Sequence, residues 1–92
     1  MNKSIKKKWL KNLKSGKFEQ AHSQLKSGKN SFCCLGVLCE TMKVGYKPSS
    51  SYPCATTLKT AGLKKEQAEI LANLNDSDRS FDYIANFIEK NH

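Results

Sequence analysis

The chain has 92 residues, of which 38% are hydrophobic and 26% charged, and its formal net charge is +8. This length allows one domain, and the balance of apolar and charged residues is typical of a globular protein, which excludes an intrinsically disordered chain. No apolar run approaches the roughly 20 residues of a membrane span, and no apolar signal segment follows the charged N-terminus. We therefore expect a single domain over residues 1–92, located in the cytoplasm and without a membrane partner.

The positive charge is concentrated in the first third of the chain. Residues 1–30 contain nine lysines and one acid, whereas residues 31–92 contain seven basic and seven acidic residues. This uneven distribution predicts an acidic partner, either a protein or a nucleic acid. Lysine outnumbers arginine fifteen to one, which favours non-specific Coulomb attraction over bidentate reading of bases. The predicted partner-binding residues are Lys7, Lys8, Lys11, Lys14, Lys17, Lys26 and Lys29.

Residues 3–15 have the spacing of an amphipathic helix. Ile5, Trp9 and Leu13 recur every four residues and would lie on one face, with lysines opposite. Gly16 follows at the position where a left-handed residue commonly ends a helix. The lysine face has two interpretations, which are a surface for an acidic partner and a solvated face that keeps a small protein soluble.

Residues 17–34 predict a short β-hairpin. A polar, glycine-containing break at 26–31 separates two short mixed runs, 21–25 and 32–34, which would form the two arms. An isolated hairpin is marginally stable in water, so we expect it to pack against helices.

Residues 35–42 return to helical spacing and complete a cysteine-rich segment over 17–42. Gly36 costs up to ~1 kcal/mol relative to alanine inside a helix, so we expect it to allow the close approach of another backbone. The predicted inward face consists of Leu35, Leu38, Cys39 and Met42.

The second half of the chain predicts a long loop and a helical hairpin. The loop at 43–53 is rich in proline and serine, and a short helix is possible near 57–61. A helix over 64–74 and a final helix capped by Ser80 would form the hairpin at 64–91. The fold class is therefore mainly α (α+β), with about four helices and one short β-hairpin.

Several motifs resemble a family of small phage-encoded and prophage proteins of uncharacterised function. They are SGKFEQ (15–20) after a tryptophan-containing helix, FCCLGVLCE (32–40), and LNDSDRSFDYIANFIE (74–89). The resemblance covers nearly the whole chain, although Asp78 and Arg79 replace a glycine-containing turn. It implies a phage origin and an accessory role, with counter-defence as one such role, and it carries over no catalytic or binding residue.

The cysteines allow three interpretations. A reducing compartment favours buried thiols that pack as small hydrophobic groups, and we expect all four cysteines to be of this kind, with no metal or cofactor. A small structural zinc module is one alternative, because four cysteines and two histidines supply enough ligands, although not with the usual spacing. The other is a cysteine-dependent enzyme in which Cys34 is the nucleophile and His22 the base. The cysteines are Cys33, Cys34, Cys39 and Cys54.

Together these features predict a non-enzymatic phage accessory protein. It would bind an acidic host protein or a nucleic acid through its lysine-rich N-terminal helix and adjoining loop, and so modulate host defence or metabolism. No catalytic residue is expected, because no third residue is evident in the sequence to orient His22.

Overall fold

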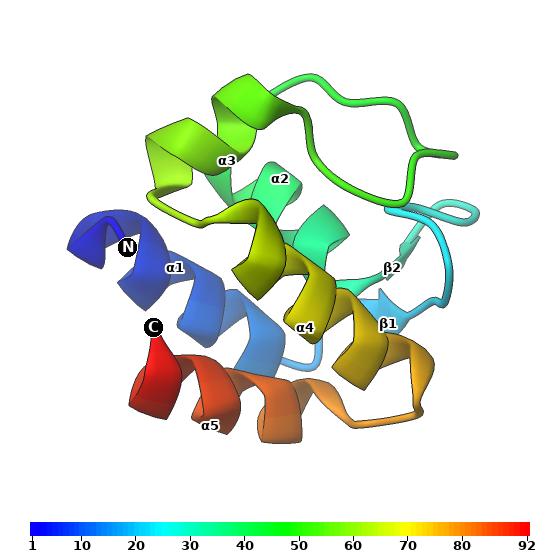
Figure 1. Ribbon diagram of the computed structural model, residues 1–92. Helices are drawn as coiled ribbons and strands as arrows, with labels where there is room; N and C mark the ends of the chain where they lie inside the picture. Colours follow the sequence, from blue (N-terminus) through cyan, green and yellow to red (C-terminus); the bar gives the residue numbers. More distant parts are fainter.

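The computed structural model describes residues 1–92 and contains five helices and a two-stranded sheet (Figure 1). The strands β1 (Glu19–Gln20) and β2 (Ser31–Phe32) have two residues each. The mainly α (α+β) fold class is confirmed, with one helix more than expected because residues 55–61 are also helical. None of the helices combines the length and the apolar character that a membrane crossing requires. The helices are α1 (Lys3–Lys14), α2 (Cys34–Met42), α3 (Ala55–Ala61), α4 (Lys65–Asp76) and α5 (Phe81–Asn91).

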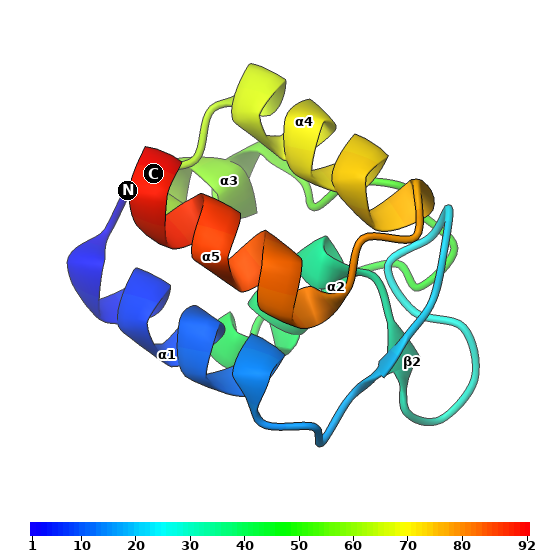
Figure 2. The ribbon, with the colours of Figure 1, turned by 90° about the horizontal axis from the view of Figure 1, so that it is seen from below.

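Helix α2 lies at the centre of the fold. It packs against α1 and α4, and α5 contacts both of these helices. Figure 2 shows α5 lying between α1 and α4, in front of α2. Every residue from 34 to 39 is buried, so α2 is apolar around its circumference, as expected for a helix surrounded by others.

Local capping signals set the ends of the outer helices as predicted. Gly16 follows α1 with a φ angle of 75°, in the left-handed region that glycine adopts without a steric cost. At the start of α5, the Ser80 hydroxyl accepts a hydrogen bond from the backbone N–H of Tyr83 at 3.1 Å. The buried side of α5 consists of Ile84, Ala85 and Ile88.

Gly36 allows α2 to lie directly against the backbone of Leu25, and the predicted close approach is confirmed. A Cβ atom at Gly36 would overlap the carbonyl group of Leu25. This carbonyl cannot move freely, because it accepts a hydrogen bond from the backbone N–H of Cys33 at 3.2 Å. The contact fixes the segment before β2 against the first turn of α2.

The predicted β-hairpin is reduced to one antiparallel bridge, between Lys26 and Phe32, and the two strands of the sheet do not form its arms. The two strands are parallel, with Glu19 opposite Ser31 and Gln20 opposite Phe32. Residues 21–25 are therefore not an arm of a hairpin but the beginning of the connection between two parallel strands.

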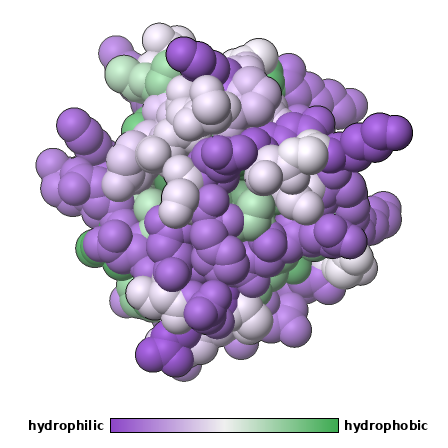
Figure 3. Space-filling view, turned by 90° about the vertical axis from the view of Figure 1, so that its right-hand side faces the viewer, coloured by the Kyte–Doolittle hydropathy of each residue, from purple (hydrophilic) through white to green (hydrophobic).

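The path of this connection explains the difference. The backbone turns at Ser23, which has a φ angle of 67°. The backbone N–H groups of Leu25 and Lys26 then donate to the carbonyls of Ser50 and Pro48, at 2.8 and 3.0 Å. The loop at 43–53 is therefore hydrogen-bonded to residues 25 and 26, beside their bridge to Phe32. Figure 3 shows the end of the molecule where these segments meet, and its surface is largely hydrophilic.

Asn75 joins the ends of three segments in the interior. It is completely buried in the last turn of α4, whereas the preceding Leu74 is only half-buried. The Asn75 side-chain oxygen accepts from the backbone N–H of Cys34 at 3.1 Å and from the Gln20 amide at 2.9 Å. The Asn75 amide nitrogen donates to the carbonyl of Ala21 at 2.7 Å. One side chain thus satisfies backbone groups at the start of α2 and beside β1.

Candidate functional site

One face of α1 is fixed on the core, which leaves its lysines outside. Trp9 and Leu13 are buried, and Ile5 is half-buried. The Trp9 indole N–H donates to the carbonyl oxygen of Cys34 at 2.9 Å, which ties α1 to the first residue of α2. Because successive side chains are about 100° apart around a helix, the lysines of α1 spread over the remaining surface.

Four lysines surround one surface hollow between α1 and the end of α2. The hollow has a volume of about 370 Å³. The Asn12 amide donates to the Thr41 hydroxyl at 2.8 Å, and this hydrogen bond joins the two helices at the hollow. We call this feature the lysine hollow, and its lining residues are Lys8, Lys11, Asn12, Lys17, Glu40, Thr41 and Lys43.

The one acidic residue of the lysine hollow already has a partner. The Tyr46 hydroxyl donates to the Glu40 carboxylate at 2.8 Å. Burial and this hydrogen bond raise the pKa of Tyr46, so the hydroxyl remains a donor at neutral pH. The lysine hollow therefore contains four ammonium groups and one carboxylate, which already accepts a hydrogen bond from Tyr46. The net positive charge of the hollow favours the binding of an anion.

The other predicted lysines do not line this hollow. Lys7 is exposed on α1, and Lys14 lies 3.7 Å from the Glu89 carboxylate of α5. Lys26 is 5.2 Å from the centre of the Phe32 ring, and Lys29 is exposed in the loop before β2. The structure thus brings together three of the seven predicted residues and separates the other four.

Lys43 belongs to the lysine hollow but was not predicted. It ends α2 in a left-handed conformation with a φ angle of 56°, which places it beside Thr41 on the side of α1. Lys43 directly follows the helix predicted over 35–42, and a lysine at the C-terminal end of a helix is commonly exposed because its charge is favoured there. The packing of α2 against α1, which the sequence did not show, brings it to the other three lysines.

Three of the four cysteines are core thiols, as expected, and one is not. Cys33, Cys34 and Cys39 are buried, whereas Cys54 is exposed just before α3. Burial raises the pKa of Cys33, raises that of Cys39 to about 12, and raises that of Cys34 well above its ordinary value. The prediction that all four cysteines lie in the core is therefore wrong for Cys54. Its place at the end of the long loop leaves the side chain in solvent.

The structure does not join the proposed nucleophile to the proposed base. The Cys34 thiol is fully buried and donates to the Leu71 carbonyl at 3.5 Å. His22 is exposed and lies 3.0 Å from the Asp78 carboxylate, which supplies the orienting partner that the sequence did not reveal. No hydrogen bond links His22 to a cysteine. No group of three or more histidine, cysteine or acidic side chains is arranged to hold a metal ion.

The exposure of Cys54 predicts selective labelling. The Cys54 sulfur lies 3.2 Å from the Thr57 hydroxyl, and this hydrogen bond lowers the thiol pKa. A lower pKa means more thiolate at a given pH, so Cys54 reacts at a lower pH than an ordinary thiol. We expect an alkylating reagent to add one label to the native protein and four after unfolding, as counted by mass spectrometry. A native Cys54→Ser variant that still takes up a label would contradict this expectation.

The sequence pattern of one protein family, described as a domain of unknown function (DUF8296), matches residues 1–52. The chain belongs to this family. The DUF8296 region contains α1, β1, β2 and α2, and therefore all four lysines of the lysine hollow. No curated protein and no solved structure matches the chain.

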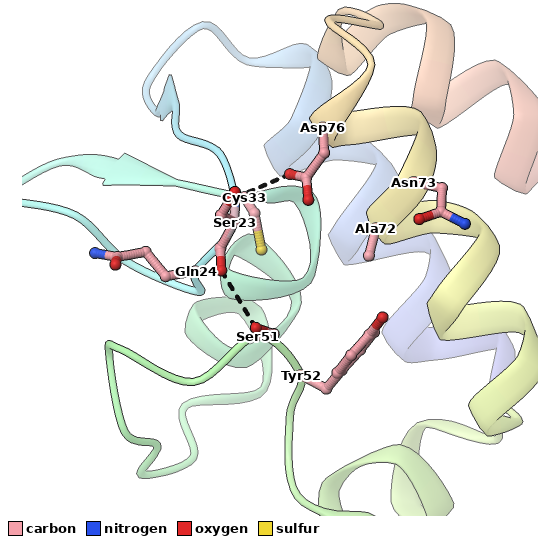
Figure 4. A pocket seen from close by; sticks show the side chains of 8 residues that line it. All are labelled: Ser23, Gln24, Cys33, Ser51, Tyr52, Ala72, Asn73 and Asp76. Carbon is pink, nitrogen blue, oxygen red and sulfur yellow. Dashed lines mark hydrogen bonds between the residues drawn. The ribbon is translucent and has the colours of Figure 1, made fainter.

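A second hollow lies where the DUF8296 region meets α4 (Figure 4). Its volume is about 260 Å³. The Asp76 carboxylate accepts from the backbone N–H of Ser23 at 2.9 Å, and the Ser51 hydroxyl donates to the Ser23 carbonyl at 3.3 Å. The first of these hydrogen bonds holds Ser23 against α4, and the second joins Ser23 to the loop at 43–53. The hollow is lined by Ser23, Gln24, Cys33, Ser51, Tyr52, Ala72, Asn73 and Asp76.

Proposed function

We propose that this protein binds an acidic macromolecule through the lysine hollow and performs no catalysis of its own. The observation that carries this proposal is the meeting of Lys8, Lys11, Lys17 and Lys43 around one hollow with a single, hydrogen-bonded carboxylate. In the free protein these ammonium groups repel one another. An anionic partner removes the repulsion and releases the counterions of both surfaces, which favours association at low salt.

The biological setting of the proposal comes from the sequence resemblance to small phage proteins. In that setting the protein is an accessory factor in the cytoplasm of the host cell. Its partner is an acidic host protein or a nucleic acid, and the outcome of binding is a change in host defence or metabolism. The high lysine content and the near absence of arginine support recognition of charge rather than of base sequence.

Neutralising the lysine hollow is expected to weaken polyanion binding strongly. The variant is Lys8, Lys11 and Lys17→Gln, and the probes are fluorescent polyglutamate and a single-stranded oligonucleotide. We expect a loss of affinity of at least tenfold at low salt, measured by fluorescence anisotropy. The slope of log affinity against log salt for the oligonucleotide should fall by up to ~2, because each lost phosphate contact removes about 0.7 from it.

A matched variant separates the site from the net charge. Lys59 is exposed on α3, Lys64 lies between α3 and α4, and Lys65 is exposed on α4. Changing these three lysines to glutamine removes an equal number of charges away from the lysine hollow. This control should keep most of the affinity. Both variants should remain folded by circular dichroism, because surface substitutions of this kind typically change stability by less than ~0.5 kcal/mol each. Equal losses of affinity in the two variants would contradict the proposal, and the lysines of the hollow would then be only a solvated surface.

A further inference from the structure

The lysine hollow continues into a neighbouring hollow that is partly lined by apolar side chains. This neighbour has a volume of about 320 Å³ and lies between α1, the end of α2, and α3. The two hollows share Lys8, Thr41 and Lys43. They therefore form one groove, with lysines at one end and Ile5, Met42 and Val44 at the other. We call it the amphipathic groove.

The apolar end of the amphipathic groove is built on the core. Ile5, Met42 and Val44 are half-buried and pack against the central cluster of buried side chains. Packing of their inner atoms holds them in place, while their outer atoms face the groove. A ligand atom placed there would remove apolar surface from water without first ordering these side chains, which favours binding.

The composition of the groove favours a protein segment over a nucleic acid. Proteins that bind single-stranded nucleic acid stack the bases on aromatic side chains and on arginine planes. Neither kind of side chain lines the amphipathic groove. An aliphatic surface beside four ammonium groups is instead complementary to an aliphatic side chain with neighbouring carboxylates.

We propose that the partner is an acidic protein segment that carries an apolar anchor residue, and that this segment lies in the amphipathic groove. The proposal rests on the proposed function and names the class of partner for the same site. The anchor fills the space beside Ile5, Met42 and Val44, and carboxylates reach Lys8, Lys11 and Lys43.

The geometry of α1 predicts the spacing within the segment. Ile5 and Lys11 are six residues apart, which corresponds to roughly 9 Å along a helix axis. An extended peptide advances about 3.3 Å per residue. The acidic residues are therefore expected about two to four positions from the apolar anchor.

Three synthetic probes test this inference on the full-length protein. The first is a short peptide of glutamates and serines with one leucine, the second has serine in place of that leucine, and the third is an oligonucleotide of equal charge. We expect the leucine peptide to bind about tenfold more tightly than the serine peptide, since part of one aliphatic side chain is buried. The oligonucleotide should bind more weakly than the leucine peptide at the same ionic strength.

Variants locate the preference within the groove. Met42→Gln keeps the length of the side chain and its helix propensity but removes an apolar group from the groove. It should reduce the ratio of the affinities for the leucine and serine peptides several-fold. The lysine variant Lys8, Lys11 and Lys17→Gln should weaken the binding of both peptides.

Each outcome distinguishes this inference from the proposed function. Equal binding of the two peptides by the wild-type protein overturns the inference and leaves anion binding intact. Tighter binding of the oligonucleotide assigns the site to nucleic acid, which also overturns the inference. Identical behaviour of the wild-type protein and the lysine variant toward all three probes overturns both. The comparison of peptides on the wild-type protein needs no substitution, so it holds even where a variant loses stability.

Discussion

Replacement of Gly36 by alanine is expected to destabilise the protein by about 3 kcal/mol, at the upper end of the effect of overpacking a core. The added methyl group would overlap the Leu25 carbonyl, which is backbone and cannot adopt another rotamer. Relief requires either a shift of α2 or loss of the hydrogen bond from Cys33 to Leu25. The free energy of unfolding from urea titration measures the effect, and the melting temperature should fall by more than 10 °C for a domain of this size.

Gly45 provides the matched control for this substitution. It lies in the loop after α2, and a Cβ atom there would meet no atom within 4 Å. Gly45→Ala should therefore leave the free energy of unfolding nearly unchanged or raise it slightly, because alanine restricts the unfolded chain. A Gly36→Ala protein as stable as the Gly45→Ala protein would show that α2 does not lie against Leu25.

Asn75→Ala is expected to cost about 3 kcal/mol of folding stability. The substitution removes the partner of the Cys34 backbone N–H and of the Ala21 carbonyl, both inside the protein. An unsatisfied buried polar group costs about 1–3 kcal/mol, and more than one group is affected here. Asn73 is exposed on the same helix and makes no side-chain hydrogen bond, so Asn73→Ala is the control. Comparable melting curves for the two variants would contradict the role assigned to Asn75.

The parts of the fold that sequence patterns predicted have local causes. Helix α1 follows from the four-residue spacing of Ile5, Trp9 and Leu13 and from Gly16, all within one short segment. The start of α5 follows from Ser80 in the same way. Gly36 was informative because glycine within a helix carries a cost that a close contact explains.

The parts that were missed depend on distant partners. The parallel pairing of β1 and β2 joins Glu19 to Ser31, and a hydrogen bond from the Ala21 N–H to the Phe32 carbonyl supports it; no local turn signal encodes this pairing. In the sequence, Asn75 looks like a solvent-exposed polar residue of a helix. Its burial depends on a hydrogen bond from the backbone N–H of Cys34, which lies 41 positions earlier.

The candidate site divides in the same way. The lysines of α1 were evident from charge and helical spacing, but their neighbours were not. Lys14 was predicted as a free binding residue, yet it lies beside Glu89, which comes near only when α5 packs on α1. Lys43 was overlooked for the converse reason, since it joins the lysine hollow only through the packing of α2 on α1.

The central position of α2 makes the protein a single cooperative unit. The segment 1–52 contains every lysine of the hollow, but the core cluster to which α2 belongs also includes Leu71 of α4 and Ile84 and Ile88 of α5. Without α4, the side of α2 that packs against it would expose apolar surface, so the stability of residues 1–52 depends on the later part of the chain. The geometry of the lysine hollow therefore depends on residues that lie nowhere near it. A cavity-forming substitution in α5 would therefore act on binding through the stability of the fold rather than by removing a contact.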